Sequence, residues 1–575
     1  QLVGQAVIRK YDQDENVTNK KIINYDWDNN EVREKRTPNS AERRYQKTLS
    51  KNFTLYADYK KNFNDRHDLS VMVGTSHESE NYDRFTAKRI NFDQQENMSL
   101  QLGSAQDQNA WSEGNQWTIN SFFSRVNYTF ANKYVIEGTI RADGSSRFDP
   151  DHRWGWFPGV NAAWRVGEEG FMKRLGWFED LKVRASYGEM GNQSGIGLYD
   201  YIQLISLSND YYPFGAGVKG QMATSGNIIS TSRTWETIQT TNVGFDFSTL
   251  NNRLYGSFDY FWKENKNMLI PKTYPSMLGA DAPSTNSGHL SIHGWEISLG
   301  WRDQIKDFSY SVRFNISDAK NKVVDRVGSN LIQLGNNETP TGYPLNSYFG
   351  YEFDGIIQNE QELEAYKSRF SEGGIPGDLS VGDAMYKDLD GDGKLSVLGD
   401  GKEGSGDVKY LGDKNPRYNF GFNLSMAWKG FDLSAFIQGV GRRTMFLEGE
   451  SRCPMPEAWY QSAEYWYGKT WTPERTDAQY PAITLKDKRN YNYYVSTNTK
   501  FNVAYARLKN LQFGYTIPQT LTSKAGLQKV RVYFSGEDLF EVHNTPNGWD
   551  PEENSGSITS YPFTRNYSFG INVVF

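Results

Sequence analysis

Three carboxylates in the second half of the chain have the spacing of a metal-binding loop. Asp388, Asp390 and Asp392 occupy alternate positions, and Gly393 follows them. These positions match the first half of a calcium loop, because alternate side chains converge and glycine permits the sharp turn. Where such a loop ends on a glutamate, this chain has Gly399. Two alternatives remain: a Ca²⁺ site at these three aspartates, or a metal-free turn held by side-chain hydrogen bonds.

Residues that would support catalysis do not form a recognisable set. The six histidines are scattered along the chain. His289 and His293 have the spacing of a zinc-binding pair on a helix, but Ser291 and Gly294 favour a strand or a turn there. No G-x-S-x-G nucleophile elbow precedes a predicted helix. We therefore expect no enzyme activity, no catalytic residues and no required cofactor.

Aromatic side chains gather in two segments that separate the predicted strands. The candidate ligand-contact residues in these segments are Trp459, Tyr460, Trp466, Tyr211 and Tyr212. Flat aromatic faces stack on sugar rings or pack against peptide side chains, and their polar edges tolerate water. The alternative is that these rings pack loop on loop, or against a partner that covers them.

The composition favours a membrane barrel. Hydrophobic residues make up 37% of the chain, yet aromatic residues reach 15%. The mean hydropathy is −0.71, and no apolar run of roughly eighteen residues exists to form a spanning helix. A barrel must be apolar only on its outward face and carries aromatic girdles at both membrane interfaces. The net charge of −6 provides no basic face, so we expect no nucleic-acid partner.

The last nine residues show the period-two pattern of a half-apolar strand. Tyr567, Phe569, Ile571, Val573 and Phe575 alternate with mostly polar or small residues. Alternate residues of a strand lie on opposite faces, so this pattern predicts one apolar face and one polar face. A closing strand of this kind that ends on an aromatic residue is typical of outer-membrane barrels. The last strand of a soluble sandwich is the alternative.

Similar alternating segments recur along the chain and predict roughly sixteen strands of about ten residues or more, the length that a tilted membrane strand needs. Predicted hairpins lie at 125–141, 242–263, 418–438 and 506–541. Predicted long loops lie at 81–115, 191–233, 325–415 and 441–500. A short helix is predicted at 360–370, inside a loop, from its helix-forming composition.

A series of longer motifs runs from about residue 110 to the end. It includes RADGSSRF (141–148), WGWFPGVNAAWRVGEEGFM (154–172), LKVRASYGEMGNQ (181–193), WETIQTTNVGFDFSTLNNRL (235–254), GWEISLGW (294–301), YKDLDGDGKL (386–395), NPRYNFGFNLSMAWKGFDLSAFIQG (415–439), LKNLQFGYTIP (508–518), VRVYFSGEDLF (530–540) and YPFTRNYSFGINVVF (561–575). In this order the motifs resemble the SusC/RagA-type TonB-dependent outer-membrane transporters of Bacteroidota.

The resemblance implies an all-β fold: a transmembrane antiparallel β-barrel in the bacterial outer membrane, here part of a 22-stranded plugged barrel. Residues 1–575 would be the carboxy-terminal part of that barrel, with the plug domain and the amino-terminal extension outside this sequence. The first strand of the whole barrel would then lie upstream. We therefore expect residues 3–11 to form an interior strand or a loop rather than the partner of 567–575.

The resemblance also implies a function. It implies TonB-dependent import of a bulky nutrient, a glycan or a peptide, together with a SusD-like surface lipoprotein that covers the barrel. TonB would act through the amino-terminal part that this sequence lacks. Outer-membrane lipid would surround the barrel. The resemblance also allows a dimer of transporter–lipoprotein pairs. The alternative from another class is a passive porin or an adhesin barrel without energy coupling.

Overall fold

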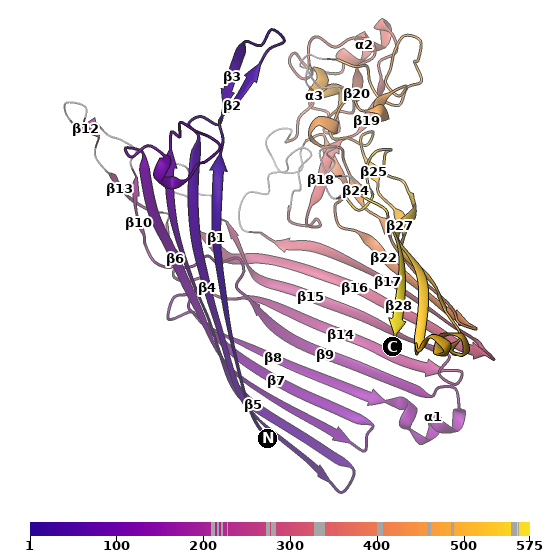
Figure 1. Cartoon of the computed structure of the whole chain (residues 1–575). Coiled ribbons are helices and arrows are strands. Elements are labelled where there is room, and N and C mark those ends of the chain that lie inside the picture. The colour runs from indigo at the N-terminus through magenta and orange to yellow at the C-terminus, as the bar shows by residue number, and fades with distance from the viewer. Residues whose placement is uncertain are drawn as a thin grey trace. The chain divides into compact units, whose positions relative to one another are not determined.

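The computed structural model is dominated by one antiparallel sheet of 16 strands (Figure 1). It describes residues 1–208, 213–214, 218–219, 222–226, 228–271, 277, 283–326, 340–398, 406–456, 462–484, 488–553, 561 and 563–575. In spatial order the strands are β1 (Leu2–Asn19), β4 (Ser40–Phe63), β5 (His67–Ile90), β6 (Gln108–Phe130), β7 (Tyr134–Ser145), β8 (Trp154–Arg165), β9 (Asp180–Asn192), β14 (Glu236–Thr249), β15 (Leu254–Pro271), β16 (Ser284–Ile305), β17 (Phe308–Asp325), β22 (Arg417–Trp428), β23 (Phe431–Arg442), β26 (Tyr505–Thr516), β27 (Lys529–His543) and β28 (Asn566–Val574). The predicted all-β class is confirmed.

The chain divides into two compact units. The first unit comprises residues 1–162, 188–238 and 269–286, and the second comprises 163–187, 239–268 and 287–575. No helix among the described residues has the length and apolar character needed to cross a membrane.

Long hairpins make up most of the first unit. β4 and β5 pair along their full 24 residues, from Ser40 opposite Ile90 to Phe63 opposite His67. A smaller hairpin, β2 (Ile22–Tyr25) with β3 (Glu31–Lys35), extends from β1. Residues 3–11 lie within β1, which pairs with β4.

The predicted loop at 81–115 is wrong in its extent. β5 continues to residue 90 and β6 begins at residue 108, so the connection between them is much shorter than predicted. Several pairs at this end are polar, such as Arg84, whose Nη1 lies 3.0 Å from Glu113 Oε1. A tilted strand needs only about 9–11 residues to cross a bilayer, and the remainder of a longer strand has no lipid-facing stripe. The backbone ladder therefore continues where the apolar alternation has stopped.

A small apolar cluster lies beside the connection between β7 and β8 in the first unit. Phe148, Phe157, Ile196 and Trp235 are buried together, and the indole Nε1 of Trp235 donates to the carbonyl of Arg153 at 2.9 Å. In the described part of the predicted loop at 191–233 the strands that follow β9 are short: β10 (Ile205–Ser208), β11 (Pro213–Phe214), β12 (Val218–Lys219) and β13 (Met222–Ser225). This segment is thus a loop region, as predicted.

In the second unit the strands follow one another as hairpins. The hairpins predicted at 242–263, 418–438 and 506–541 correspond to β14–β15, β22–β23 and β26–β27, and the one predicted at 125–141 is β6–β7 of the first unit. Lys429 and Gly430, which connect β22 to β23, both have positive φ (46° and 92°). Two such residues form the tight turn whose twist matches that of paired strands. The wide connection from β26 to β27 contains α4 (Gln519–Thr522) and η6 (Ser523–Ala525).

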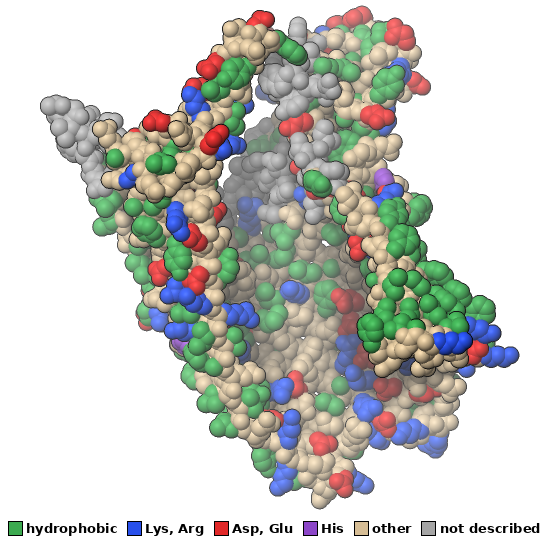
Figure 2. Space-filling model, viewed as in Figure 1, with side chains coloured by type: hydrophobic (Ala, Val, Ile, Leu, Met, Phe, Trp, Pro, Cys, Tyr) green, Lys and Arg blue, Asp and Glu red, His purple; other side chains and the backbone are tan. Residues whose placement is uncertain are grey.

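The closing strand has the register that its alternation predicts. On one face its pairs with β27 are apolar: Val573 with Val530, Ile571 with Val532, and Phe569 with Phe534. On the other face they are Asn572 with Arg531, Gly570 with Tyr533, and Ser568 with Ser535. Phe569 and Ile571 are 83% and 65% exposed, and Figure 2 shows hydrophobic side chains gathered where β28 lies. Opposite residues share a face, so the predicted segregation of apolar and polar side chains is confirmed.

The segments that follow β17 and β23 contain the remaining elements. These are β18 (Ser347–Tyr351), β19 (Phe353–Ile356), α2 (Glu360–Lys367), β20 (Ala384–Tyr386), β21 (Val408–Asp413), β24 (Thr444–Met445), η4 (Gly449–Ser451), η5 (Glu464–Trp466), α3 (Lys488–Asn492) and β25 (Phe501–Asn502). After β8, η2 (Val166–Glu168) and α1 (Gly170–Leu175) precede β9, and η1 (Leu100–Leu102) follows β5.

The predicted helix at 360–370 is confirmed as α2. The side chain of Asn359 caps it by accepting from the backbone N–H of Glu362 at 2.9 Å. Its first turn is acidic and its last turn contains Lys367, an order that suits the helix dipole.

We predict that arginine is tolerated at 572 but not at 573. Val573→Arg places a charge on the apolar face and should cost about 2–4 kcal/mol if the residue lies near the bilayer midplane. Asn572→Arg is the matched control: its side chain shares the polar face with Arg531 directly opposite, and repulsion between the two guanidiniums should cost no more than about 1 kcal/mol. Unfolding of both variants in lipid vesicles would measure the difference. Equal losses at the two positions would contradict the assignment of faces.

Candidate functional site: the polar wall and loop body of the second unit

One face of the strands in the second unit carries charges that neutralise one another. Arg184 of β9 lies between two aspartates, with Nη1 2.5 Å from Asp259 Oδ1 and Nη2 3.1 Å from Asp246 Oδ1. The ammonium of Lys182 lies 2.9 Å from Asp246 Oδ2. Arg531 of β27 likewise forms an ion pair, with the single carboxylate of Asp432 on β23. This polar wall presents paired charges and hydrogen-bonding groups, as the inner face of a barrel does.

Above the strands, two long segments fold into one loop body, defined here as the described parts of residues 340–416 and 443–504. Figure 1 draws α2, α3, β19 and β20 of this body close together. The amide of Asn492 joins its two segments: Nδ2 donates to Asp383 Oδ1 at 2.8 Å, and Oδ1 accepts from the backbone N–H of Ala384 at 3.0 Å. The backbone of Tyr351 also donates to the carbonyl of Val495 at 3.0 Å. The described parts of these two predicted long loops therefore contact each other.

Tyrosines form much of the interior of the loop body. Tyr366 and Tyr491 are buried with their hydroxyl oxygens 2.8 Å apart, and the Tyr386 backbone N–H donates to the Tyr366 hydroxyl at 2.9 Å. Burial raises the pKa values of all three phenols, and it raises the pKa of nearby Tyr348 to about 12. The hydroxyls therefore stay protonated at neutral pH and remain available as hydrogen-bond donors. Tyrosine suits such a core because its ring packs while its hydroxyl finds a polar partner.

The structure brings Trp466 into a second buried cluster of the loop body. Its ring packs edge-on against Tyr480 and Tyr493, with centroids 4.9 Å and 5.5 Å away, and only 3% of the residue is exposed. Tyr465, its neighbour, has its hydroxyl 2.6 Å from that of Tyr480. This placement favours loop-on-loop packing for Trp466 over a ligand-stacking role.

The other four candidate ligand-contact residues, Trp459, Tyr460, Tyr211 and Tyr212, lie outside the described residues. Their role in ligand contact stays a prediction.

The predicted aspartate loop does bring its carboxylates together. One oxygen from each of Asp388, Asp390 and Asp392 lies within 4.8 Å of the others. Asp388 also accepts from the backbone N–H groups of Gly391 and Gly393, at 2.7 Å and 2.9 Å. Burial, followed by the charges of its two neighbours, raises the pKa of Asp390. The loop thus has both the hydrogen-bonded turn expected of a metal-free loop and the converging carboxylates expected of a Ca²⁺ site.

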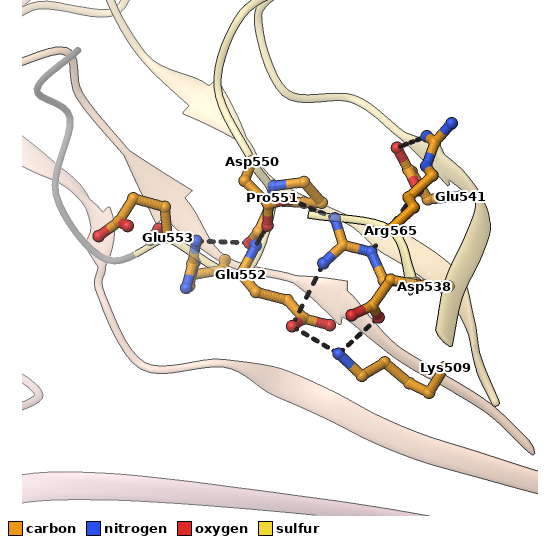
Figure 3. A network of polar contacts seen from close by, with 10 residues as sticks. Lys509, Asp538, Glu541, Asp550, Pro551, Glu552, Glu553 and Arg565 are labelled. Atoms are coloured by element: carbon orange, nitrogen blue, oxygen red, sulfur yellow. Dashed lines mark hydrogen bonds and ion pairs between the residues drawn. The ribbon is translucent and has the colours of Figure 1, made fainter. Parts of the chain in front are cut away.

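A buried ionic network holds the last long loop of the chain to the strands. Arg507 of β26 is 1% exposed, with Nη2 2.5 Å from Asp550 Oδ2, Nη1 3.3 Å from Glu552 Oε2 and Nε 3.7 Å from Glu541 Oε2. Figure 3 shows Lys509 reaching both Glu552 and Asp538, at 3.0 Å and 2.7 Å. We call these residues the rim network.

Two further arginines extend the rim network. Arg443 donates from Nη2 to the carbonyls of Pro551 and Glu553, at 2.8 Å and 2.9 Å. Arg565 pairs with Glu541 at 2.6 Å, as Figure 3 shows. Sequence reasoning missed this network because its partners come from separate strands and an irregular loop. The only available signal was the concentration of carboxylates at 537–541 and 550–553 near two basic positions of a predicted strand.

Comparison with known proteins identifies the family. The model described as TonB dependent receptor-like, beta-barrel matches residues 8–539. The chain belongs to this family of TonB-dependent receptor β-barrels. The family consists of receptors and transporters rather than enzymes, and its barrel fold implies the outer membrane.

The relatives agree with the SusC/RagA-type resemblance. TonB-dependent receptor P3 of Formosa agariphila is 32% identical over 558 residues, which cover 92% of this chain and 52% of that protein. TonB-dependent receptor SusC of Bacteroides thetaiotaomicron is 26% identical over 568 residues, which cover 91% of this chain and 50% of SusC. The chain thus spans about half the length of the curated relatives it matches.

A solved structure shares the fold. The structure of the RagAB peptide transporter matches with a TM-score of 0.80 at 23% identity, covering 100% of this chain and 60% of that one. The predicted β-barrel architecture of this type is confirmed.

The rim network should be the most sensitive point of the last loop. Arg507→Ala leaves Asp550, Glu552 and Glu541 without their shared cation, a change that typically costs about 3–5 kcal/mol at a buried site. Faster proteolysis within 544–565 and a lower unfolding temperature in detergent would report the loss. Arg565→Ala is the control: its side chain is half exposed, so its removal should cost less than about 1 kcal/mol. Equal sensitivity of the two variants would contradict the role assigned to Arg507.

Proposed function

We propose that this chain forms the barrel wall and outer loops of a receptor that imports a bulky nutrient, a glycan or a peptide, across the outer membrane. The observation that carries the proposal is the family match over residues 8–539. The polar wall supports it, because its charged and hydrogen-bonding groups offer contacts to a passing polar molecule. The proposed chemistry is non-covalent throughout.

We propose that the loop body is where a SusD-like surface lipoprotein docks. The body has its own tyrosine-rich core, so it offers a preformed surface rather than a flexible chain. The RagAB peptide importer, whose fold this chain shares, has been solved in states described as closed-closed and open-open. By analogy, the lipoprotein would act as a lid whose closure over the nutrient is a shift between two populated states.

Energy for import would come through TonB, which would act on parts of the receptor that this sequence does not include. On the resemblance to SusC/RagA-type transporters, we also propose that two transporter–lipoprotein pairs form a dimer. The competing function is a passive porin or an adhesin, which needs no energy source.

Dependence on energy separates import from passive flow. Cells that express the receptor should accumulate labelled oligosaccharides or peptides too large for general porins, and deletion of TonB should abolish the accumulation. The matched measurement is uptake of a small sugar through general porins in the same cells, which should not change. Accumulation that continues without TonB would favour the porin, and surface binding without accumulation would favour the adhesin.

We also propose that the loop at Asp388, Asp390 and Asp392 binds Ca²⁺. The convergence of its three carboxylates supports this proposal, and bound Ca²⁺ would relieve their mutual repulsion. Calorimetric titration with CaCl₂ should show saturable binding that Asp390→Asn weakens at least about tenfold, whereas Asp307→Asn, in an exposed turn, should leave it unchanged. Absence of saturable heat in the unmodified protein would leave the metal-free turn as the correct alternative.

A further inference from the structure

A recess of about 270 Å³ lies in the second unit where the strands meet the loop body. Its lining comes from β17, β21 to β24 and the segments beside them: Ala319, Lys320, Asn321, Pro344, Tyr410, Asp413, Asn415, Arg417, Arg442, Arg443 and Thr444. Four of these residues are basic and only one, Asp413, is acidic. The uncharged lining residues are two amides, two hydroxyl-bearing residues, Ala319 and Pro344, so polar and apolar groups both contribute to its surface.

Three of the nearby charges are already engaged. Arg417 forms a two-pronged ion pair with Asp318. Arg443 donates to backbone carbonyls of the last loop. Asp413 accepts from the Tyr410 hydroxyl at 2.7 Å and from the backbone N–H of Asn415 at 3.0 Å.

The other two basic residues of the lining, Lys320 and Arg442, have no carboxylate within ion-pair distance among the residues that the structure describes. Arg442 lies directly opposite Arg417 in the β22–β23 ladder. Like charges that face each other across a ladder are destabilising, so the fold keeps this arrangement at a cost. Lys500, half-buried in the loop body, has no described ion-pair partner either, and its charge interacts unfavourably with those of Arg442 and Lys409.

The face of β23 on which Arg442 lies indicates whether its side chain is directed toward the cargo or toward lipid. Along β23 it is an even number of residues from Asp432, Ser434 and Gln438, and no residue of that strand has positive φ to break the alternation. These polar residues belong to the polar wall, whereas Leu433 and Ile437 pair with Met426 and Phe422 on the apolar face. Arg442 therefore points toward the side that a cargo would pass, not toward lipid.

We propose that this recess is an anion subsite for the imported molecule, with Arg442 as its principal ligand and Lys500 reinforcing its positive potential. The group it takes is a carboxylate or a sulfate, since a guanidinium binds such planar or tetrahedral oxyanions through paired N–H donors. Asn321 and Asn415 of the lining suit a hydroxyl or amide next to the charged group. The inference rests on the proposed function only in naming the cargo as the source of the anion.

The test uses the detergent-purified protein and probes that differ only in charge. Tetragalacturonate and its methyl ester form one pair, and tetraglutamate and tetraglutamine form the other. The charged member of at least one pair should bind about tenfold tighter or more, because a charge-assisted hydrogen bond is worth about 1.5–3 kcal/mol and about 1.4 kcal/mol is tenfold. The pair that shows the difference identifies the source as an acidic sugar or an acidic peptide.

Variants then locate the site. Arg442→Gln should remove most of the preference for charge, and Lys500→Gln should reduce it. Asp413→Asn, which removes the one carboxylate of the lining, should strengthen binding of the charged probe. Lys429→Gln, in the turn at the opposite end of the same β22–β23 hairpin, is the matched control and should change nothing. Unfolding temperatures of all four variants check that the fold is retained.

Several outcomes would overturn the proposal. Equal affinity for charged and neutral probes would do so, as would unchanged preference in Arg442→Gln. Loss of co-purified lipopolysaccharide in Arg442→Gln, with probe binding intact, would assign the arginine to lipid phosphate instead. None of these measurements requires TonB, so the anion subsite and energised import fail or succeed independently.

Discussion

The structure depends on the requirement that every backbone N–H and C=O find a partner where water is absent. In a bilayer an unpaired backbone group costs several kcal/mol, so a chain of strands must be paired along its whole membrane depth. Between neighbouring strands the ladders of this chain satisfy that requirement, and β4 and β5 alone pair over 24 residues each. Among the described residues β1 and β28, at the two ends of the strand order, pair on one side. Because side chains alternate across a ladder, the same pairing also separates an apolar face from a polar one.

Charge placement follows from that separation. On the polar face, arginines such as Arg184 and Arg531 are matched with aspartates of neighbouring strands, so the wall is polar but locally neutral. At the loop end the matching becomes denser, and Arg507 collects three carboxylates from β27 and the last loop. Arg302, Arg313 and Arg442 on the polar face have no such match among the described residues, and of the three only Arg442 lines the recess.

The loop body solves a different problem, which is how long connections become rigid outside the membrane. Its clusters use tyrosine and tryptophan rings, and the tyrosine hydroxyls bond to backbone carbonyls and to one another. A sequence rich in aromatic residues therefore has two uses for them, on the apolar face of strands and inside folded loops. The sequence pattern cannot separate these uses from ligand contact, because all three need a flat apolar ring with a polar edge.

Much of the fold could be read from the sequence. The period-two pattern located most hairpins and the faces of β28, and helix-forming composition located α2, because each depends on the local sequence. The period-two pattern failed at 81–115, where the strands continue beyond any lipid-facing stripe and only the backbone ladder maintains them. The spacing of Asp388, Asp390 and Asp392 likewise predicted their convergence, since the turn that joins them is local.

Only the tertiary structure decided which residues distant in sequence contact one another. Trp466 could have faced a ligand, but packing against Tyr480 and Tyr493 buries it. The rim network and the recess at Arg442 assemble from several strands and loops whose register no local pattern encodes. Alternation and capping act over a few residues and are legible in a single sequence. Burial and charge matching are properties of neighbours in space, and they become defined only when the chain has folded.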